Sequence, residues 1–175
     1  MNMKSKSNTA LVFALLMLGL ACQKEAKTLG EFTFFNDFES QFGYNPNVAL
    51  GKSHSGRAFF KLDANTEFSP AFIHQFKTIA NRGFSKVKFT AYVLMPDPNN
   101  LGALVIQVWD PSNQPIKVEQ KNFTAKEAGT NRWVELSLEL PLAGLYTPEN
   151  QIRCFVHNPG FQNFYVDDFT VEFVQ

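Results

Sequence analysis

Residues 84–94 read FSKVKFTAYVL, and apolar and polar side chains alternate along most of this stretch. One set consists of Val87, Phe89, Ala91 and Val93, and the intervening set consists of Lys86, Lys88, Thr90 and Tyr92. Successive side chains of a β-strand point to opposite faces, so this period of two predicts a strand with one face in a core. The i, i+3, i+4, i+7 spacing of an amphipathic helix is absent from the sequence.

The same alternation recurs along the chain. Residues 132–140 read RWVELSLEL, and residues 102–109 read GALVIQVW, in which Leu104, Ile106 and Val108 oppose Gln107 and Trp109. Further strands are expected at 32–35, 57–62, 67–73, 115–122, 151–157 and 163–174. Clusters of Pro, Asp, Asn and Gly at 95–102 and 110–115 are typical of turns between strands. One helical turn is expected within 122–131.

About nine strands joined by short turns predict an all-β fold, a two-sheet antiparallel β-sandwich with little helix. Residues 31–175 form one segment of ordinary single-domain size, without internal repeats, which is long enough to bury a core. The 19 phenylalanines of the chain supply large apolar side chains for it.

The N-terminus is typical of an exported protein. Lys4 and Lys6 precede an apolar run at residues 10–21, which is short for a membrane-spanning helix and suits a secretory signal. Residues 1–21 resemble a bacterial lipoprotein signal peptide that ends before Cys22, which would be lipidated, with 22–30 as a linker. Gly19 departs from that pattern, where leucine is more usual. The alternative is an ordinary cleaved signal with an incidental cysteine.

Cleavage of such a signal has consequences for charge and location. Loss of Lys4 and Lys6 leaves 14 of the 16 basic residues against 16 acidic ones, a net charge of −2, which gives no reason to expect nucleic acid binding. Several acyl chains on Cys22 would hold the protein at a membrane without a spanning helix. Residues 22–27 also resemble the charged export signals of surface lipoproteins in Bacteroidota, although a solvated linker would look the same. Cys154 alternates with apolar neighbours and is expected to be a free buried thiol.

Two adjacent acids lie within the aromatic run NFYVDDFTVEFVQ at 163–175. Phe164 and Val166 share one parity, whereas the apolar residues after the acids, Phe169 and Val171, share the other. This slip predicts a β-bulge near Asp167 and Asp168, because a bulge inserts one extra residue into a strand.

Four segments in a fixed order carry a resemblance to a known family. They are FFNDFES at 34–40, GKSHSGRAFFKLD at 51–63, NRWVELSLEL at 131–140 and FYVDDFTVEF at 164–173. The series resembles the jelly-roll carbohydrate-binding modules of families four, nine and twenty-two and the wider galactose-binding-like sandwiches. The resemblance covers the whole predicted domain and implies that the first and last strands lie together.

The resemblance also implies a structural calcium site between those strands. Carried over, its ligands would be Glu39, Asp167 and Asp168, with a backbone carbonyl from residues 52–55. Ca²⁺ takes about six to eight oxygen ligands, and both aspartates can reach one ion only if the bulge intervenes. The alternative is that one aspartate caps a turn or pairs with Arg57 or Lys61 while the other faces solvent.

The sequence contains only incomplete versions of known catalytic motifs. The GKS at 51–53 lacks the earlier glycine of a phosphate loop, since Pro46 stands there, and Ser55 occupies the final glycine position of a nucleophile elbow. The three histidines, His54, His74 and His157, stand singly, without the close spacing of zinc sites. No enzyme is therefore expected, and a small hydrolase would need two carboxylates facing one cleft.

The polar faces of the strands indicate where a sugar would bind. Residues expected on them are Tyr92, Gln107, Trp109, Arg153, Phe155 and His157. An aromatic ring binds the apolar face of a pyranose, and neighbouring polar groups hydrogen-bond its hydroxyls. The predicted ligand residues are Trp109, Tyr92, Gln107, Arg153 and His157. The alternative for each ring is that a loop covers it, and Trp133 is expected to be structural.

These observations predict a non-catalytic glycan-binding module of an envelope lipoprotein, anchored in the bacterial outer membrane and exposed at the cell surface. Its partners would be a polysaccharide, the membrane through the lipid alone, and proteins of an envelope complex. The alternative is an adhesin-type interaction lipoprotein of the same fold without a sugar site. Exposed rings of Trp109 and Tyr92 on one concave surface would favour the hypothesis of glycan binding, and buried rings would favour the alternative.

Overall fold

The computed structural model describes residues 31–145 and 147–175. The predicted signal peptide, the lipidated Cys22 and the linker at 22–30 lie outside the described residues. Within the described ranges, no helix is both long and apolar enough to cross a membrane.

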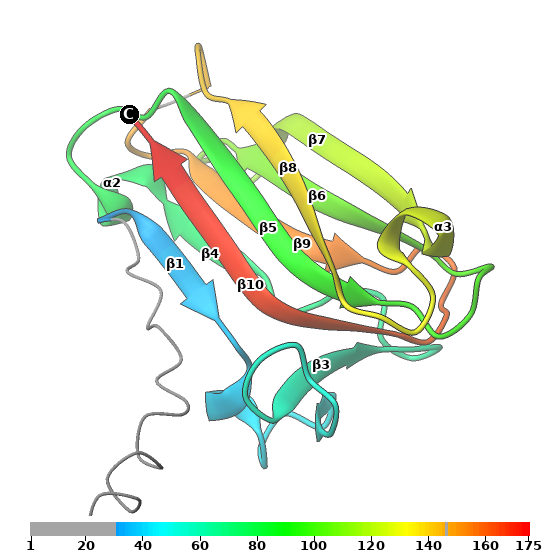
Figure 1. The fold of residues 1–175 in the computed structure, drawn as a ribbon. Coiled ribbons are helices and arrows are strands. Elements are labelled where there is room, and N and C mark those ends of the chain that lie inside the picture. The colour runs from blue at the N-terminus through cyan, green and yellow to red at the C-terminus, as the bar shows by residue number, and fades with distance from the viewer. Residues whose placement is uncertain (1–30, 146) are drawn as a thin grey trace, which may run out of the picture.

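Ten strands of the described residues form two sheets (Figure 1). The six-stranded sheet has the order β2-β3-β10-β5-β8, with β1 also paired to β10, and the four-stranded sheet has the order β4-β9-β6-β7. Strand bounds are β1 Thr33–Asn36, β2 Val48–Leu50, β3 Ala58–Leu62, β4 Phe72–Gln75, β5 Lys86–Leu94, β6 Leu101–Trp109, β7 Pro115–Thr124, β8 Val134–Pro141, β9 Gln151–His157 and β10 Phe164–Val174. The strand pairs within both sheets are antiparallel. The expected β-sandwich is confirmed.

The core lies between the sheets and follows the alternation in the sequence. On β5, the apolar set from Val87 to Val93 is fully buried, while Lys86 and Tyr92 on the other face are partly exposed. Rings of Phe38, Phe76, Phe89, Phe123 and Phe164 are among the largest fully buried side chains. Burial of this apolar surface is the main favourable term for the fold, at about 25 cal/mol per Å².

The central strand β10 contains the predicted bulge. Its pairing with β5 shifts register between Asp167 and Thr170, and Asp168 has a left-handed backbone with φ 47°. Residues before the shift bury Phe164 and Val166, and residues after it bury Val171 and Phe173. The bulge thereby keeps both apolar halves of the strand in the core. The first and last strands lie together, as expected, because β1 pairs with β10.

Short helices and one short strand differ from the sequence prediction. The expected helical turn is α3, Ala125–Ala128, where Thr124 and Glu127 form a capping box. The sequence did not indicate α2, Phe76–Ile79, the 3₁₀ turn η1, Glu39–Gln41, or the three-residue β2. Such elements are too short to show a period.

The strand expected at 67–73 is mostly wrong, because β4 begins only at Phe72. The preceding residues still hydrogen-bond to the β9 region, with Ser69 N donating to Val156 O at 2.9 Å and Asn158 N donating to Glu67 O at 2.7 Å. Pro70 has no N–H and cannot continue a ladder of backbone hydrogen bonds. This segment is therefore a loop that runs beside the four-stranded sheet.

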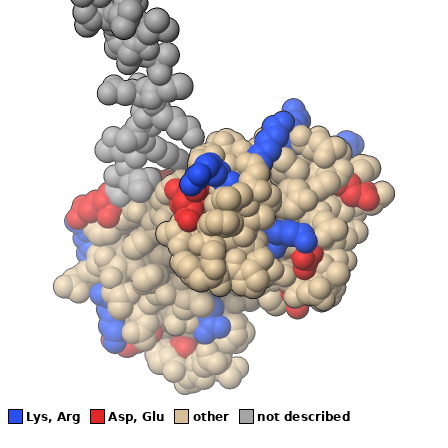
Figure 2. All heavy atoms as spheres, turned by 90° about the horizontal axis from the view of Figure 1, so that it is seen from below, with Lys and Arg blue, Asp and Glu red and all other residues tan. Residues whose placement is uncertain are grey.

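Charged side chains are scattered over the surface. On the face in Figure 2, Lys and Arg lie singly or beside Asp and Glu among uncharged residues. Ion pairs at the surface include Lys86 with Glu139 at 2.9 Å and Lys117 with Glu119 at 3.0 Å. This face therefore presents no concentrated charge of one sign to a ligand.

Candidate functional site

The outer face of the four-stranded sheet brings together several of the predicted ligand residues. The pairing register places Gln107 of β6 beside Arg153 of β9, and Arg153 beside Ile73 of β4. The neighbouring row contains Phe155, and the row beyond it contains His157. All three β9 side chains share one face because they alternate with the buried Ile152, Cys154 and Val156.

Trp109 and Arg153 form one packed unit on this face. The Arg153 guanidinium lies 3.9 Å from the centroid of the Trp109 ring, within the range of a cation–π contact. Arg153 Nε donates to Gln151 Oε1 at 2.6 Å, and its Nη2 donates to Asn113 Oδ1 at 2.9 Å. Trp109 Nε1 donates to Gln107 Oε1 at 2.8 Å. Arg153 is therefore held in place and covers one face of the Trp109 ring.

A hollow of about 340 Å³ lies beside this unit. It is lined by Phe68, Ser69, Ala71, Ile73, Gln107, Arg153 and Phe155. The Phe68 ring meets the Phe155 ring edge-on at 5.5 Å and stacks on the His157 ring at 4.9 Å. His157 Nε2 lies 3.2 Å from Glu67 Oε1. The loop at 63–71 thus supplies one wall of the hollow, and the sheet supplies its floor.

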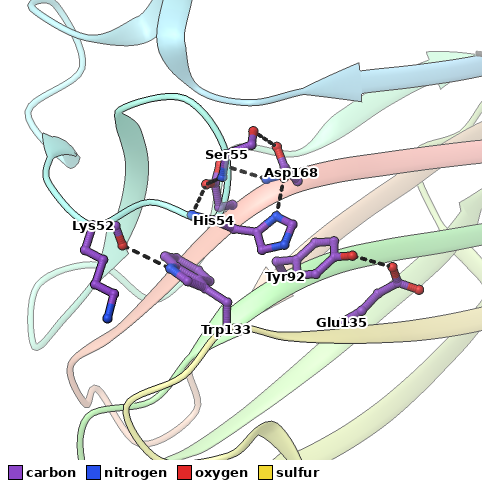
Figure 3. A network of polar contacts seen from close by, with 8 residues as sticks. Lys52, His54, Ser55, Tyr92, Trp133, Glu135 and Asp168 are labelled. Atoms are coloured by element: carbon purple, nitrogen blue, oxygen red, sulfur yellow. Dashed lines mark hydrogen bonds and ion pairs between the residues drawn. The ribbon is translucent and has the colours of Figure 1, made fainter. Parts of the chain in front are cut away.

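Tyr92 does not join this group. It lies on β5 of the other sheet, where its ring stacks on His54 with the centroids 3.5 Å apart (Figure 3). Its hydroxyl donates to Glu135 Oε2 at 2.8 Å. This hydrogen bond, together with burial, raises the pKa of Tyr92 to about 12. The expectation that Tyr92 and Trp109 share one surface is therefore wrong.

Asp167 is fully buried at the bulge of β10 and binds the backbone of the loop at 51–57. Its Oδ2 accepts from His54 N at 2.8 Å and from Ser55 N at 3.1 Å, and its Oδ1 accepts from Asp168 N at 2.8 Å. Burial raises the pKa of this carboxyl from 3.8 to about 6, and the hydrogen bonds from the loop oppose that rise. Asp167 therefore ties the loop to the central strand.

Asp168 binds the side chains of the same loop. Its Oδ2 lies 2.5 Å from His54 Nδ1, and its Oδ1 accepts from Ser55 Oγ at 2.6 Å (Figure 3). Trp133 Nε1 donates to Lys52 O at 3.0 Å, so the indole also holds this loop, in line with the structural role expected for it. The serine bonds to the aspartate and not to the imidazole, which is not the order of a catalytic triad.

Glu39 reaches the far end of the same loop. Its Oε1 accepts from Arg57 N and from Ala58 N, the latter at 2.6 Å. These two hydrogen bonds, the Arg57 bond first, lower the pKa of the Glu39 carboxyl. Gly56 allows the Glu39 carboxylate to come close to the backbone of the loop, since φ of Gly56 is +57° and a Cβ there would clash with that carboxylate.

The three predicted calcium ligands therefore all contact the loop at 51–58 through hydrogen-bond donors. Among residues 31–145 and 147–175, no three His, Cys, Asp or Glu side chains gather as a metal site. N–H and O–H groups aimed at a carboxylate oppose a cation at the same oxygen, and in this structure these donors bind the three carboxylates. The calcium ion stays a prediction. The alternative of one solvent-facing aspartate is wrong, because both are buried.

Four lining residues of the hollow, Phe68, Ser69, Ala71 and Ile73, were missed in the sequence. Phe68 fell within the expected strand at 67–73, and Ile73 gave no polar or aromatic signal. Their role depends on how the loop at 63–71 folds over β9, which alternation along one strand cannot predict. No Asp or Glu lines this hollow, so it offers no carboxylate pair of the kind that a hydrolase needs.

Comparison with known proteins supports the fold. No protein-family model matches the chain, and no curated protein sequence matches it. The xylan-binding domain CBM22-2 of Paenibacillus barcinonensis Xyn10C superposes with a TM-score of 0.54 at 13% identity, over 81% of this chain and 99% of that one.

Two further solved structures give the same result. The C-terminal family 22 carbohydrate-binding module of Clostridium thermocellum Xyn10B has a TM-score of 0.54 at 13% identity, over 81% of this chain and 92% of that one. The tandem CBM22-1–CBM22-2 domain of the P. barcinonensis protein gives 0.55 at 14% identity, over 86% of this chain and 47% of that one. At such identities the likeness shows the fold alone, and it confirms the expected β-sandwich.

Proposed function

We propose that this protein is a non-catalytic glycan-binding module that takes a neutral polysaccharide on the outer face of its four-stranded sheet. The observation that carries the proposal is the hollow in which Arg153 and Gln107 lie beside the rings of Phe155 and Phe68. Its volume of about 340 Å³ falls within the ordinary range of ligand sites, about 300–1,000 Å³.

The chemistry of the lining suits a sugar. A pyranose presents an apolar C–H face to an aromatic ring and hydroxyls to polar groups at its edge. Phe68 and Phe155 supply the rings, while Arg153 and Gln107 supply donors and an acceptor. Arg153 is held by Gln151 and Asn113, so little side-chain entropy remains to be lost on binding.

The choice of glycan for a first test comes from the structures of similar fold. Their descriptions name xylan as the ligand of several of those modules. We therefore take β-1,4-linked xylan as the first probe, with cellulose-type and mannan-type polymers beside it.

The proposal includes the cell envelope as the place of action. The sequence of residues 1–22 supports lipidation of Cys22 and attachment to a membrane, and the charged segment at 22–27 supports export to the cell surface. A module held there would keep polysaccharide near enzymes and transporters of an envelope complex. Replacement of Cys22 by alanine is expected to move the protein from the membrane fraction to the soluble fraction. Retention of the Cys22→Ala protein in the membrane fraction would contradict the anchor.

Affinity electrophoresis and calorimetry on the purified full chain test the glycan proposal. Wild-type protein is expected to be retarded in a gel that contains its polysaccharide. Arg153→Ala and Phe155→Ala are each expected to weaken binding about tenfold, which corresponds to about 1.4 kcal/mol. Arg57→Ala is the matched control, since Arg57 is an exposed arginine in the loop that leads into β3 of the six-stranded sheet, away from the hollow. Uniform absence of retardation across the panel would overturn the proposal.

One observation favours the second candidate, an interaction or adhesin-type lipoprotein without a sugar site. The Trp109 ring is covered on one face by Arg153 and bonded through Nε1 to Gln107, so it is less available for stacking than the sequence indicated. Glycan binding that survives both Arg153→Ala and Phe155→Ala would remove the proposed site. Capture of a defined envelope protein by wild type in the absence of glycan binding would support this second candidate.

A further inference from the structure

A second hollow, of about 570 Å³, opens at the edge of the sandwich between β1 and β4. The two strands belong to different sheets, and their side chains meet there, with the Phe34 and Phe72 ring centroids 4.8 Å apart. Figure 1 shows β1 and β4 at the same edge of the molecule. The lining comprises Phe34, Phe35, Asn36, Ser40, Gln41, Tyr44, Pro70, Ala71, Phe72, Ile73, His74 and Phe169.

The second hollow adjoins the first. Ala71 and Ile73 line both of them, from the segment that leads into β4 and from β4 itself. β4 pairs only with β9 among the described strands, so it forms the rim of its sheet. Ile73 is 49% exposed and stands on that rim, and Ala71 is small and exposed. A ligand that leaves the sheet face across β4 thus meets the second hollow directly.

The lining of the second hollow is also amphipathic and carries no Asp, Glu, Lys or Arg. Tyr44 is 71% exposed at its wall, and no other described residue hydrogen-bonds to its hydroxyl. The Gln41 side-chain oxygen accepts from Asn45 at 3.1 Å, and the Asn36 oxygen accepts from Phe38 N at 2.9 Å. Each amide therefore keeps its NH₂ group for another acceptor, since no described residue accepts from either nitrogen. A neutral polyhydroxylated chain would satisfy these donors and stack on Tyr44.

We propose that the second hollow extends the binding surface, so that one polysaccharide chain crosses the edge strand β4 and occupies both hollows. This inference rests on the proposed function of the first hollow. A polymer is the occupant that both volumes, their shared wall and the absence of Asp and Glu from both linings favour, because successive units of one chain present the same chemistry to each hollow. Tyr44 is then a binding residue, and Ala71 marks the crossing point.

Chain length is the variable that tests the inference. Calorimetry on the full chain compares a disaccharide with a hexasaccharide in the xylose, glucose and mannose β-1,4 series. Wild type is expected to bind the hexasaccharide of its preferred series at least about tenfold more tightly than the disaccharide, because only the longer ligand reaches the second hollow. Equal affinity for both lengths would overturn the inference and leave the proposed function intact. Failure of every ligand to bind would overturn the proposed function itself.

Two pairs of variants locate the effect. Tyr44→Ala is expected to weaken hexasaccharide binding about two- to tenfold, the worth of one aromatic contact, and to leave disaccharide binding unchanged. Phe42→Ala, which removes an exposed ring two residues away that does not line the hollow, should change neither. Ala71→Trp should block the crossing and remove the advantage of the longer ligand, whereas Ala64→Trp in the exposed turn should not.

The variants also reveal other occupants. Unchanged hexasaccharide affinity in both Tyr44→Ala and Ala71→Trp would overturn the inference. Hexasaccharide binding that tightens in wild type, and not in Tyr44→Ala, once residues 1–30 are removed would show that the N-terminal segment competes for the second hollow, and would support the inference.

Discussion

Replacement of Gly56 by alanine should lower the free energy of unfolding by more than the cost of placing alanine in a left-handed backbone conformation. Gly56 has φ +57°, and a Cβ there would lie 2.9 Å from Glu39 Cδ and closer still to Oε1. The side chain of Glu39 would have to move, and Ala58 N would lose its acceptor. Gly43 is the matched control, since its φ is +93° and a Cβ there would have nothing within 4 Å.

The magnitudes separate the two variants. A left-handed backbone costs alanine about 1 kcal/mol relative to glycine, and both variants pay it. A buried N–H left without a partner costs about 1–3 kcal/mol more. Ala58 is fully buried, whereas Arg57 is exposed, so we count only the Ala58 bond. Gly56→Ala should therefore cost about 2–4 kcal/mol, and Gly43→Ala about 1 kcal/mol.

Equilibrium urea unfolding of the purified full chain at neutral pH measures both costs. The Glu39→Ala background supplies a double-mutant cycle, in which Gly56→Ala should cost no more than Gly43→Ala. The excess cost should also shrink in acid. Hydrogen bonds from the loop depress the folded-state pKa of Glu39, so its stabilisation is present above its unfolded pKa of 4.5 and is lost as the pH falls through the lower folded value. Equal costs for the two glycine variants in the wild-type background would refute the reasoning.

Three further predictions concern the buried Asp167, the predicted calcium ion and the buried Cys154. Burial raises the pKa of Asp167 from 3.8 to about 6. In buffer that contains chelator, its contribution to the free energy of unfolding should therefore be full below pH 3.8 and be lost as the pH rises through 6. Urea unfolding should show this loss in wild type and not in Asp167→Asn, and parallel pH profiles would contradict it. If the predicted calcium ion binds, thermal melts with and without chelator should differ by several degrees, and an unchanged melting temperature would contradict the calcium site. Burial raises the pKa of the Cys154 thiol, so a thiol reagent should label Cys154 in the Cys22→Ala variant only at the rate of unfolding; rapid labelling of this folded variant would show that Cys154 is accessible.

Alternation along single strands was sufficient to predict the core. The apolar sets of β5, β8 and β9 are buried or half-buried as the sequence indicated, because a period of two fixes which side chains share a face. The parity slip in the last strand likewise predicted the bulge at Asp167. These features are local, since each depends on a strand and one adjoining core.

Alternation did not predict which sheet a strand joins, and the candidate site depended on that. Tyr92 and Trp109 both point away from the core, but β5 and β6 belong to different sheets. The two rings therefore lie on opposite outer faces of the sandwich, although their strands are consecutive in the chain. Trp109, Gln107, Arg153, Phe155 and His157 come from β6 and β9, which are hydrogen-bonded neighbours, so this part of the predicted set lies on one face.

The hydrogen-bond donors to Glu39, Asp167 and Asp168 could not be predicted from the sequence for a similar reason. Two of the three donors to Asp167 lie more than a hundred residues earlier, at His54 and Ser55, and no local pattern links the two segments. The resemblance placed Glu39 and the aspartates near the loop at 51–58 correctly, but their observed contacts are hydrogen bonds to that loop.

The positions of the loop network and of the first hollow allow stability and binding to be separated. Asp167 and Asp168 act through β10 of the six-stranded sheet, while Arg153 and Phe155 lie on the outer face of the four-stranded sheet, with the core between them. The sites share no partner, so changes at one should add to changes at the other. Loss of glycan binding in Arg153→Ala with an unchanged free energy of unfolding would then assign Arg153 to recognition, and loss of stability in Asp168→Ala with unchanged affinity would assign Asp168 to the scaffold.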